Sequence, residues 1–469
     1  MASDTNSYDV IIVGAGTSGS CVAGALSAGG LRCLILEAGP HFTRDTYPRT
    51  ELDANSRLYW GGGLELNTDA DIGFLRARVV GGGSIVNQAL MDRFDDVALD
   101  SWREQSGVDF FSSDGIAPWY DKAESQLSLQ YIPTEYRNRN AQIFADGFAA
   151  NGYVCAPLRR AQRDCRFQDG NDCIVCLAGC PIDSKQSMPV TVLRRALEAG
   201  AELQPETEVL GVAEVDGGVT VATRTAASGE QTYRARALAL AGGAIGTSSL
   251  LLRAGFGARL PLLGRNFYSH PQYMHLAVYD EPVDAHKGPM QSLKSADPNF
   301  RRSGFKLENV YAPPVGVAML LPGFGRAHLD RMRRLRHFAC IEVSVRDQHP
   351  GQIRVTGRGQ TVLEKHLDAE DRARRDRGFA TVRNIFLATG AREIIEGSLG
   401  ISLHLMGGCN MGTDPHTSVV GPDYKLHGFR RIYATDSSIF PNAPGINPAL
   451  TIMALSWRAG DQILRDMRA

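Results

Sequence analysis

The chain has 469 residues, of which 43% are apolar and 22% charged, and this length predicts two or three structural units rather than one small core. The formal net charge of -1 gives no electrostatic reason to expect nucleic acid or an anionic membrane as a partner. No apolar run approaches the roughly 18 residues of a membrane span, and residues 1–9 lack the segments of a secretory signal, so we expect a cytoplasmic protein without a membrane span.

The first structured segment has the pattern of a βαβ unit. Residues 9–13 and 33–36 are short apolar runs typical of buried parallel strands, and a small-residue helix is expected between them. The turn after the first run carries a GxGxxG pattern, whose glycines let the backbone and a helix N-terminus approach a pyrophosphate, while an acid after the second strand accepts from ribose hydroxyls. The residues predicted to bind a dinucleotide here are Gly14, Gly16, Thr17, Ser18, Gly19 and Glu37.

A second glycine-rich segment follows at residues 78–87, which contain three glycines and a serine. Such a loop has several backbone amides free to point one way, which suits a diphosphate or the edge of a planar ring. The alternative is a flexible surface loop. The apolar pairs 79–80 and 85–86 on either side favour a buried loop.

Residues 94–148 read as a helical insertion over a cleft, and a group of cysteines comes after them. Cys173, Cys176 and Cys180 have spacings that fit a metal or iron-sulfur turn, because short loops aim successive sulfurs at one point. We favour the other interpretation, in which reduced or disulfide-linked cysteines hold together an excursion that has little core of its own.

The middle of the chain is predicted to return to the first sheet and then leave it again. We expect a helix over 187–203, strands over 208–213, 219–222 and 235–240, and a helix over 248–253. A second excursion over 270–395 contains strand-like runs at 315–321 and 338–345. It also contains a charged helix at 368–387, whose charges are typical of a solvated face.

The candidate catalytic centre lies near the C-terminus. His404 precedes a glycine pair, and Asn447 is enclosed between Gly445-Ile446 and Pro448, which is the pattern expected where a base meets a rigid backbone corner. The alternative for His404 is a buried histidine whose ring is satisfied by the backbone.

These motifs, in this order, make the whole chain resemble the glucose-methanol-choline (GMC) oxidoreductases. The resemblance implies an α/β fold, with a Rossmann-like FAD-binding domain interleaved with a substrate domain on a largely antiparallel sheet. We expect residues 1–95, 186–268 and 398–469 to form the FAD-binding domain. Residues 96–185 and 269–397 are expected to form the substrate-binding domain, including the cysteine-rich excursion.

The resemblance also implies further FAD contacts. Asp436 resembles the family's acid near the pyrophosphate and ribitol, and Val209 resembles the residue whose main chain meets adenine; the alternatives are a turn-capping acid and a plain strand residue. Val86 stands where some members attach FAD through a histidine, so non-covalent FAD is expected. The residues expected to contact FAD in addition to the GxGxxG segment and Glu37 are Ala38, Arg78, Gly81, Gly82, Ser84, Asn87, Val209, Gly242, Asp436, Asn447 and Pro448.

In this family the expected reaction is FAD-dependent oxidation of an alcohol, with hydride passing to flavin N5 and the hydroxyl proton to a base. His404 occupies the position of that base, and Asn447 is expected to hydrogen-bond the reacting oxygen, which leaves His404 as the sole base. His270 is expected to be structural, in the connection between the domains. The expected substrate is a sugar, an aminosugar or another polar small molecule, and oxygen or another acceptor takes the electrons.

Two alternatives stay open at this point. One is a dehydrogenase that passes electrons through a cluster at Cys173, Cys176 and Cys180, and the other is a flavin-binding protein without catalysis. The sequence leaves oxidase and dehydrogenase undecided, because oxygen access depends on a few side chains near the flavin.

Overall fold

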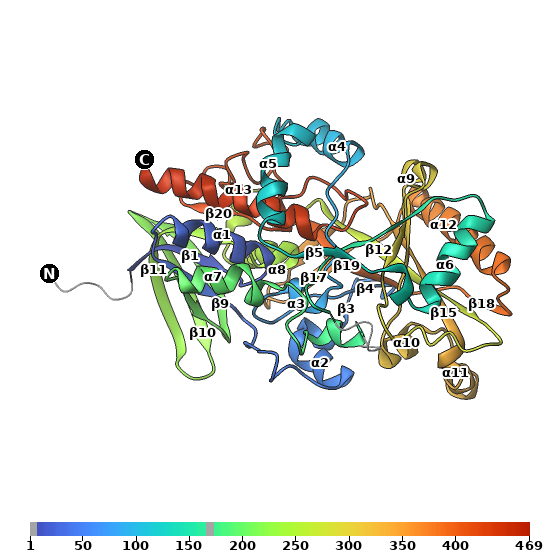
Figure 1. The fold of residues 1–469 in the computed structure, drawn as a ribbon. Helices are drawn as coiled ribbons and strands as arrows, with labels where there is room; N and C mark the ends of the chain where they lie inside the picture. Colours follow the sequence, from blue (N-terminus) through green and yellow to red (C-terminus); the bar gives the residue numbers. More distant parts are fainter. Residues whose placement is uncertain (1–6, 166–172) are drawn as a thin grey trace.

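The computed structural model describes residues 7–165 and 173–469, and these form two lobes, each built on its own β-sheet (Figure 1). The sheet on the left in Figure 1 contains the N-terminal strand, and the sheet toward the right contains the long strands of the second excursion. Within the described residues, no helix has the length and apolar character needed to cross a bilayer.

The first sheet is the parallel unit predicted at the N-terminus, extended by an antiparallel hairpin. In the described part of the chain its strands run in the order β8-β2-β1-β11-β10-β9, and β20 pairs with β11. The pairs of β1 with β2 and β11, of β2 with β8 and of β11 with β20 are parallel. The bounds are β1 (Ser7–Val13), β2 (Cys33–Leu36), β8 (Glu202–Gln204), β9 (Thr207–Val215), β10 (Gly218–Thr225), β11 (Gly229–Leu240) and β20 (Ile432–Ala434).

Helices α1 and α13 pack closely on this sheet. A Cβ at Gly460 of α13 would lie 2.6 Å from Cβ of Ala25 in α1, so glycine at this position sets how near the two helices come. Small residues at such a crossing let the two helix backbones come close together. The helices of this lobe are α1 (Thr17–Ala28), α5 (Ser113–Glu124), α7 (Val192–Glu198), α8 (Gly243–Arg253) and α13 (Ala449–Arg468).

The second sheet is antiparallel except where β19 runs parallel to β4. Among the described residues its order is β3-β4-β19-β12-β15-β14-β13-β6, and β18 pairs with β12. Helices α6 and α12 pack against it at the right of Figure 1. Its strands are β3 (Glu65–Leu66), β4 (Ile72–Phe74), β6 (Cys155–Pro157), β12 (Phe267–Val278), β13 (Leu293–Ser295), β14 (Phe305–Asn309), β15 (Phe338–Val345), β18 (Glu393–Ile395) and β19 (Gly400–Gly407).

Shorter elements connect and cover the two sheets. The remaining helices are α2 (Glu51–Leu58), α3 (Gly83–Val86), α4 (Asp96–Ser106), α6 (Arg139–Ala150), α9 (Pro298–Ser303), α10 (Pro314–Leu320), α11 (Gly325–Met332) and α12 (Ala369–Ala388). The remaining strands are β5 (Leu129–Tyr131), β7 (Arg159–Ala161), β16 (Gln352–Val355) and β17 (Thr361–Glu364). The second sheet includes β3, β4 and β19, which lie in ranges that the sequence analysis assigned to the FAD-binding domain.

The predicted fold class is confirmed, and two element predictions are wrong. The helix expected over 187–203 is divided into a 3₁₀ turn at Met188–Val190, α7, and the edge strand β8. The strand expected over 315–321 is the helix α10. Its N-terminal amides, from Val315 and Gly316, donate to the carboxylate of Glu51 in α2, and this long-range cap overrides the β-branched pattern.

The two glycine-rich segments lie back to back. Gly14 has φ +104°, and a Cβ there would lie 2.5 Å from the carbonyl oxygen of Ala241. Gly82 has φ +52°, and a Cβ there would lie 2.7 Å from Cα of Gly16. The turn after β1 and the loop before α3 therefore meet backbone to backbone, at a distance that excludes side chains.

We expect Gly82→Ala to lower the free energy of unfolding by about 1–3 kcal/mol, because alanine adds both left-handed strain and a clash with Gly16. The measurement is chemical denaturation of the purified protein. Gly211→Ala in β9 is the matched control, since a Cβ there meets nothing within 4 Å. Equal losses in the two variants would contradict the close approach of the two loops.

Candidate active site

One cavity of about 640 Å³ brings together residues from both lobes. Thr17, Gly83 and Asn87 from the glycine-rich segments line it together with His404 and Asn447. Its wall also includes strand residues of the second sheet, among them Gln272 and Glu342. Further lining residues from the predicted site or its neighbours are Val86, Leu177, Ala178, Pro448 and Ala449.

The cavity receives the N-termini of two long helices. Helix α1 begins at Thr17 and α13 at Ala449; neither has a side-chain cap or an acidic residue in its first turn. Uncapped amides and the positive end of the helix dipole favour a negatively charged ligand group. Together with the close-packed Gly16 and Gly82, this arrangement fits the diphosphate of a dinucleotide.

The residues expected at the ribose and adenine lie outside the cavity lining. Glu37 is buried, and its two carboxylate oxygens accept from the backbone amides of Ala15, at 2.9 Å, and Gly39, at 2.8 Å. Burial raises the pKa of Glu37 to about 7. Val209 is buried in β9, and Arg78 is exposed with its guanidinium 5.0 Å from the centre of the Trp60 ring. Ala38 directly follows Glu37 and is half-buried.

Asp436 and Gly242 belong to one cap at the start of α8. Oδ2 of Asp436 accepts from the amide of Gly243 at 2.8 Å and from the hydroxyl of Thr247 at 2.6 Å, and Gly242 donates to the same hydroxyl at 3.1 Å. The other carboxylate oxygen of Asp436, Oδ1, accepts from the amide of Ser438 at 2.8 Å. Asp436 therefore ties the end of β20 to the glycine turn before α8, as a turn-capping acid does.

The loop before α3 is buried, as its apolar flanks predicted: Val79, Val80 and Ile85 are almost inaccessible. Ser84 accepts from the amide of Met188 at 3.0 Å and donates to the carbonyl of Gly81 at 2.6 Å. The ring of backbone carbonyls around Lys185 fixes the loop from the other side. The Lys185 ammonium donates to the carbonyls of Ile85, Asn87 and Cys176.

The cysteine-rich segment touches the cavity through Leu177 and Ala178. Cys176 and Cys180 are buried, whereas the side chain of Cys173 falls outside the described residues. Among the described residues, no group of three or more His, Cys, Asp or Glu side chains is placed to hold a metal ion. Because the proposed cluster includes Cys173, it stays a prediction.

His404 is in direct contact with a second imidazole. Nδ1 of His404 lies 3.1 Å from Nδ1 of His270, and Nε2 of His270 accepts the backbone N–H of Gly445 at 2.8 Å. Since the Gly445 amide occupies that lone pair, a neutral His270 carries its proton on Nδ1 and donates it to His404. A neutral His404 in this arrangement then carries its own proton on Nε2. His270, expected to be only structural, thus sets the tautomer of His404.

Both imidazoles are held neutral. Burial, and secondly the nearby Lys306 ammonium, lower the pKa of His404 to about 3. Burial also lowers the pKa of His270 well below its usual range, with His404 and three cations, including Lys306, adding to the shift. His404 is therefore uncharged at neutral pH.

Asn447 is oriented by a buried ion pair. The Lys306 ammonium lies 2.5 Å from Oε1 of Glu308 and donates to Oδ1 of Asn447 at 2.8 Å. Nδ2 of Asn447 donates to the same Glu308 oxygen at 3.0 Å. Because lysine only donates and a carboxylate only accepts, the amide orientation is unambiguous. One of the two N–H groups on Nδ2 is left for a ligand.

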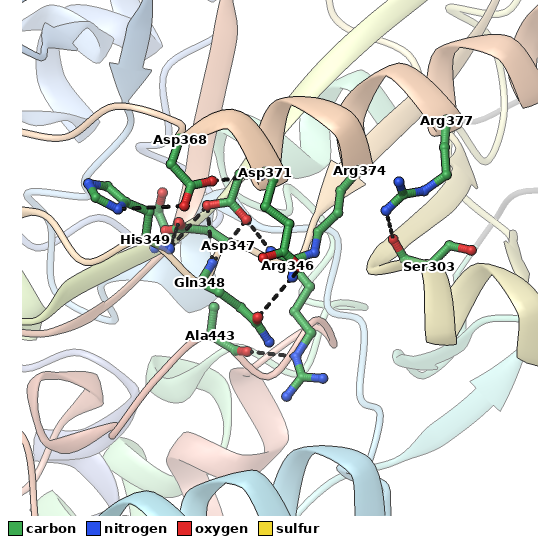
Figure 2. Close-up of polar contacts among 12 residues, drawn as sticks. Ser303, Arg346, Asp347, Gln348, His349, Asp368, Asp371, Arg374, Arg377 and Ala443 are labelled. Atoms are coloured by element: carbon green, nitrogen blue, oxygen red, sulfur yellow. Dashed lines mark hydrogen bonds and ion pairs between the residues drawn. The ribbon is translucent and has the colours of Figure 1, made fainter.

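The residues that follow β15 hold both the segment of Asn447 and the strand of His270 in place. Figure 2 shows Arg346 donating to the carbonyl of Ala443, at 3.1 Å, in the turn that leads to Asn447. The next residue, Asp347, accepts from the amide of Ser269, beside His270, at 3.1 Å, and from the buried Lys365 at 2.7 Å. Asp371 of α12 accepts the amides that follow, from Gln348 and His349 (Figure 2).

The sequence missed the polar residues on the second sheet. Lys306, Glu308 and Glu342 are charged residues within strands and belong to no motif. A usable signal existed for Glu342, because it is a single acid inside the continuous apolar strand 338–345. Lys306 and Glu308 alternate with apolar Phe305 and Leu307, a period-two pattern that places them on one face.

With this geometry described, comparison with known proteins assigns the class. The two glycine loops, the uncapped helix ends and the imidazole belong to a dinucleotide-dependent oxidoreductase. Models of the GMC oxidoreductase family match residues 8–272 and 348–456. The chain belongs to this family, and is an FAD-dependent oxidoreductase that acts on alcohols.

Individual relatives are distant but cover nearly the whole chain. The chain is 28% identical to an uncharacterised GMC-type oxidoreductase of Sinorhizobium fredii, over 97% of this chain and 94% of the relative. It is 26% identical to a long-chain-alcohol oxidase of Arabidopsis thaliana, over 96% of this chain and 68% of that protein. The crystal structure of pyridoxine 4-oxidase from Mesorbium loti has the same fold, with a TM-score of 0.78 at 18% identity, covering 97% of this chain and 99% of that one.

Lys306→Met should lower the free energy of unfolding by about 3–5 kcal/mol, because it leaves the buried Glu308 carboxylate without its cation. Denaturation of the flavin-loaded protein measures the loss. The double variant Lys306→Met/Glu308→Gln is the control, and we expect it to lose less than the single variant. A double variant as unstable as the single one would show that the buried charge is not the cause.

Proposed function

We propose that the cavity binds FAD non-covalently and a small polar alcohol next to it, with His404 as the base and Asn447 as the group that holds the reacting oxygen. The FAD-binding domain would comprise 1–95, 186–268 and 398–469, and the substrate-binding domain 96–185 and 269–397. Val86, in place of a histidine, is the basis for non-covalent attachment. The observation that carries the proposal is that His404 and Asn447 share one cavity with the uncapped start of α1.

The chain's own residues divide the work at the reacting alcohol. When bound, FAD supplies the acceptor for hydride from the carbinol carbon. Asn447 donates its remaining N–H to the hydroxyl oxygen, and Lys306 with Glu308 prevents the amide from turning. His404 receives the hydroxyl proton.

Proton acceptance at Nε2 of His404 requires the proton arrangement to change. His404 must then carry a proton on Nδ1 and donate it to His270, whose own proton moves to Nε2. That shift gives up the hydrogen bond from the Gly445 amide. His270 is therefore a positioning residue whose tautomer decides whether Nε2 of His404 donates or accepts.

The inner wall supports a polar substrate of the kind expected, a sugar, an aminosugar or another polar small molecule. Gln272, Gln291 and Glu342 line the cavity together with His404 and Asn447. Apolar residues such as Met274, Tyr311 and Leu320 line other parts of it.

Anaerobic mixing of the flavin-loaded protein with a library of alcohols and sugars tests the proposal through bleaching of the flavin, and admitting oxygen afterwards tests the acceptor. A flavin that no alcohol reduces would contradict it.

His404→Ala should keep the flavin and lose turnover by about 10²–10⁴-fold, the usual contribution of a positioned base. Flavin absorbance of the purified variant checks cofactor binding, and the rate of anaerobic flavin reduction checks chemistry. His416→Ala, at an exposed turn, is the control. Unchanged reduction in the His404 variant would remove it as the base.

The pKa of His404 predicts an unusual pH profile. A base must be uncharged, and a pKa of about 3 keeps this imidazole uncharged far below 6.5. For a neutral alcohol, log kcat/KM should therefore stay level from about pH 7 to pH 5 and fall only in more acid solution. Lys306→Met removes a cation and should move the fall to higher pH. A fall with unit slope beginning near pH 6.5 in the unaltered enzyme would contradict the assigned environment.

A further inference from the structure

Two buried oxygen atoms in the cavity wall have no hydrogen-bond partner. They are Oε1 of Glu342 and Oε1 of Gln272, on side chains that are 1% and 2% exposed. Both residues line the cavity. Buried acceptors are normally satisfied, so two unsatisfied acceptors in one binding cavity indicate a missing donor from a ligand or water.

The register of the second sheet puts these two residues on one face. Glu342 of β15 is paired with Met274 of β12, and Gln272 is two residues from Met274, so the two acceptors point to the same side. On its other side Glu342 is paired with Glu308 of β14, whose carboxylate holds Asn447. The unsatisfied oxygens therefore belong to the wall that also orients the proposed catalytic amide.

The two acids on this wall differ in their partners. Glu308 has its cation, because Lys306 lies 2.5 Å from it and is also bonded to Asn447. Among the described residues Glu342 has no ion-pair partner, although it is as deeply buried as Glu308. Lys306 is not among the residues that line the cavity, and Arg49, a cationic residue that does line it, is exposed next to α2.

A donor for this place must supply more than one N–H or O–H group. A hydroxyl has a single donor, whereas a protonated amine has three donors, no acceptor and a positive charge that can pair with the Glu342 carboxylate. We propose that Glu342 and Gln272 form a subsite for a protonated amine of the substrate, and that the enzyme oxidises small amino alcohols. This inference rests on the proposed function, since it concerns the substrate of the same cavity.

Binding of such a ligand changes the protonation of Glu342. Burial, together with the neighbouring Glu308 carboxylate, raises the pKa of Glu342 to about 8, so the free carboxyl holds a proton at pH 7. An ammonium group beside it favours the carboxylate and lowers that pKa. The carboxyl proton passes to the solvent, while the ammonium keeps its own protons and donates them to Glu342 and Gln272.

The first test compares alcohols of equal shape with the flavin-loaded enzyme. The pairs are 4-amino-1-butanol with 1-pentanol, and 4-(aminomethyl)benzyl alcohol with 4-ethylbenzyl alcohol. We expect kcat/KM for the amine to exceed that of its partner by about tenfold to a hundredfold in at least one pair, as a charge-assisted hydrogen bond provides. Glu342→Gln should abolish this preference, and Glu135→Gln, the same change at an exposed site, should preserve it.

The second test needs no turnover. Butylammonium, which has no hydroxyl group, is titrated into the oxidised flavin-loaded protein at pH 7 in two buffers of different ionisation enthalpy. Binding should release close to one proton in the unaltered protein. In Gln272→Leu, which keeps the carboxyl group, we expect weaker binding with the proton release intact, so the test stands even if Glu342→Gln does not fold.

The outcomes separate the two proposals. If no alcohol reduces the flavin but butylammonium binds with proton release, the proposed function fails and the subsite remains. If alcohols reduce the flavin but amines have no advantage and release no proton, the subsite is wrong and water satisfies Glu342.

Discussion

The proposed active site depends on the way the two residues that follow β15 hold two distant segments of the chain together. Arg346 fixes the turn before Asn447, and Asp347 fixes the strand that carries His270. Asp347 is itself held by Lys365 inside a fully buried ion pair, for which burial raises the pKa of Asp347 to about 7. Because buried charges tolerate little displacement, this pair gives the imidazole and the amide a common rigid reference.

Because the two imidazoles are buried and neutral, the positions of the protons in their hydrogen bonds, rather than their charges, determine the chemistry. Neither His270 nor His404 is positively charged at neutral pH, and each ring carries one proton. The direction of the hydrogen bond between them therefore determines which nitrogen of His404 can accept a proton. On the facing side, Lys306 and Glu308 form a compensated pair and Glu342 does not. The cavity thus combines neutral proton-transfer groups with one acid that has no ion-pair partner in the described part of the chain and that burial keeps protonated at pH 7.

The sequence was sufficient for the parts whose chemistry is local. The βαβ unit and the glycine turns follow from short-range patterns, and most strands of the first sheet were predicted, whereas β8 was expected to be helical. Short-range patterns also indicated His404 and Asn447, whose catalytic roles stay a prediction. The polar wall could not be read in this way, because Lys306 and Glu308 of β14 are brought beside Glu342 of β15 only by strand pairing. The error at α10 has the same origin, since its cap comes from Glu51 in another helix. A period-two pattern shows which residues of one strand share a face, but it does not show which residues of another strand they will meet.

The first sheet is completed by segments far along the chain, and this affects how the protein folds during synthesis. β1 pairs with β11, more than two hundred residues further on, and Ser18 beside the first glycine turn donates to the carbonyl of Thr435 at 2.8 Å. The cofactor cradle is therefore incomplete on the ribosome until almost the entire chain has emerged. Folding must close long loops before the flavin can contribute its binding energy, which makes assembly slow and exposes apolar strands in the meantime. Flavin that binds only the completed native state then adds its binding energy to the stability of the finished enzyme.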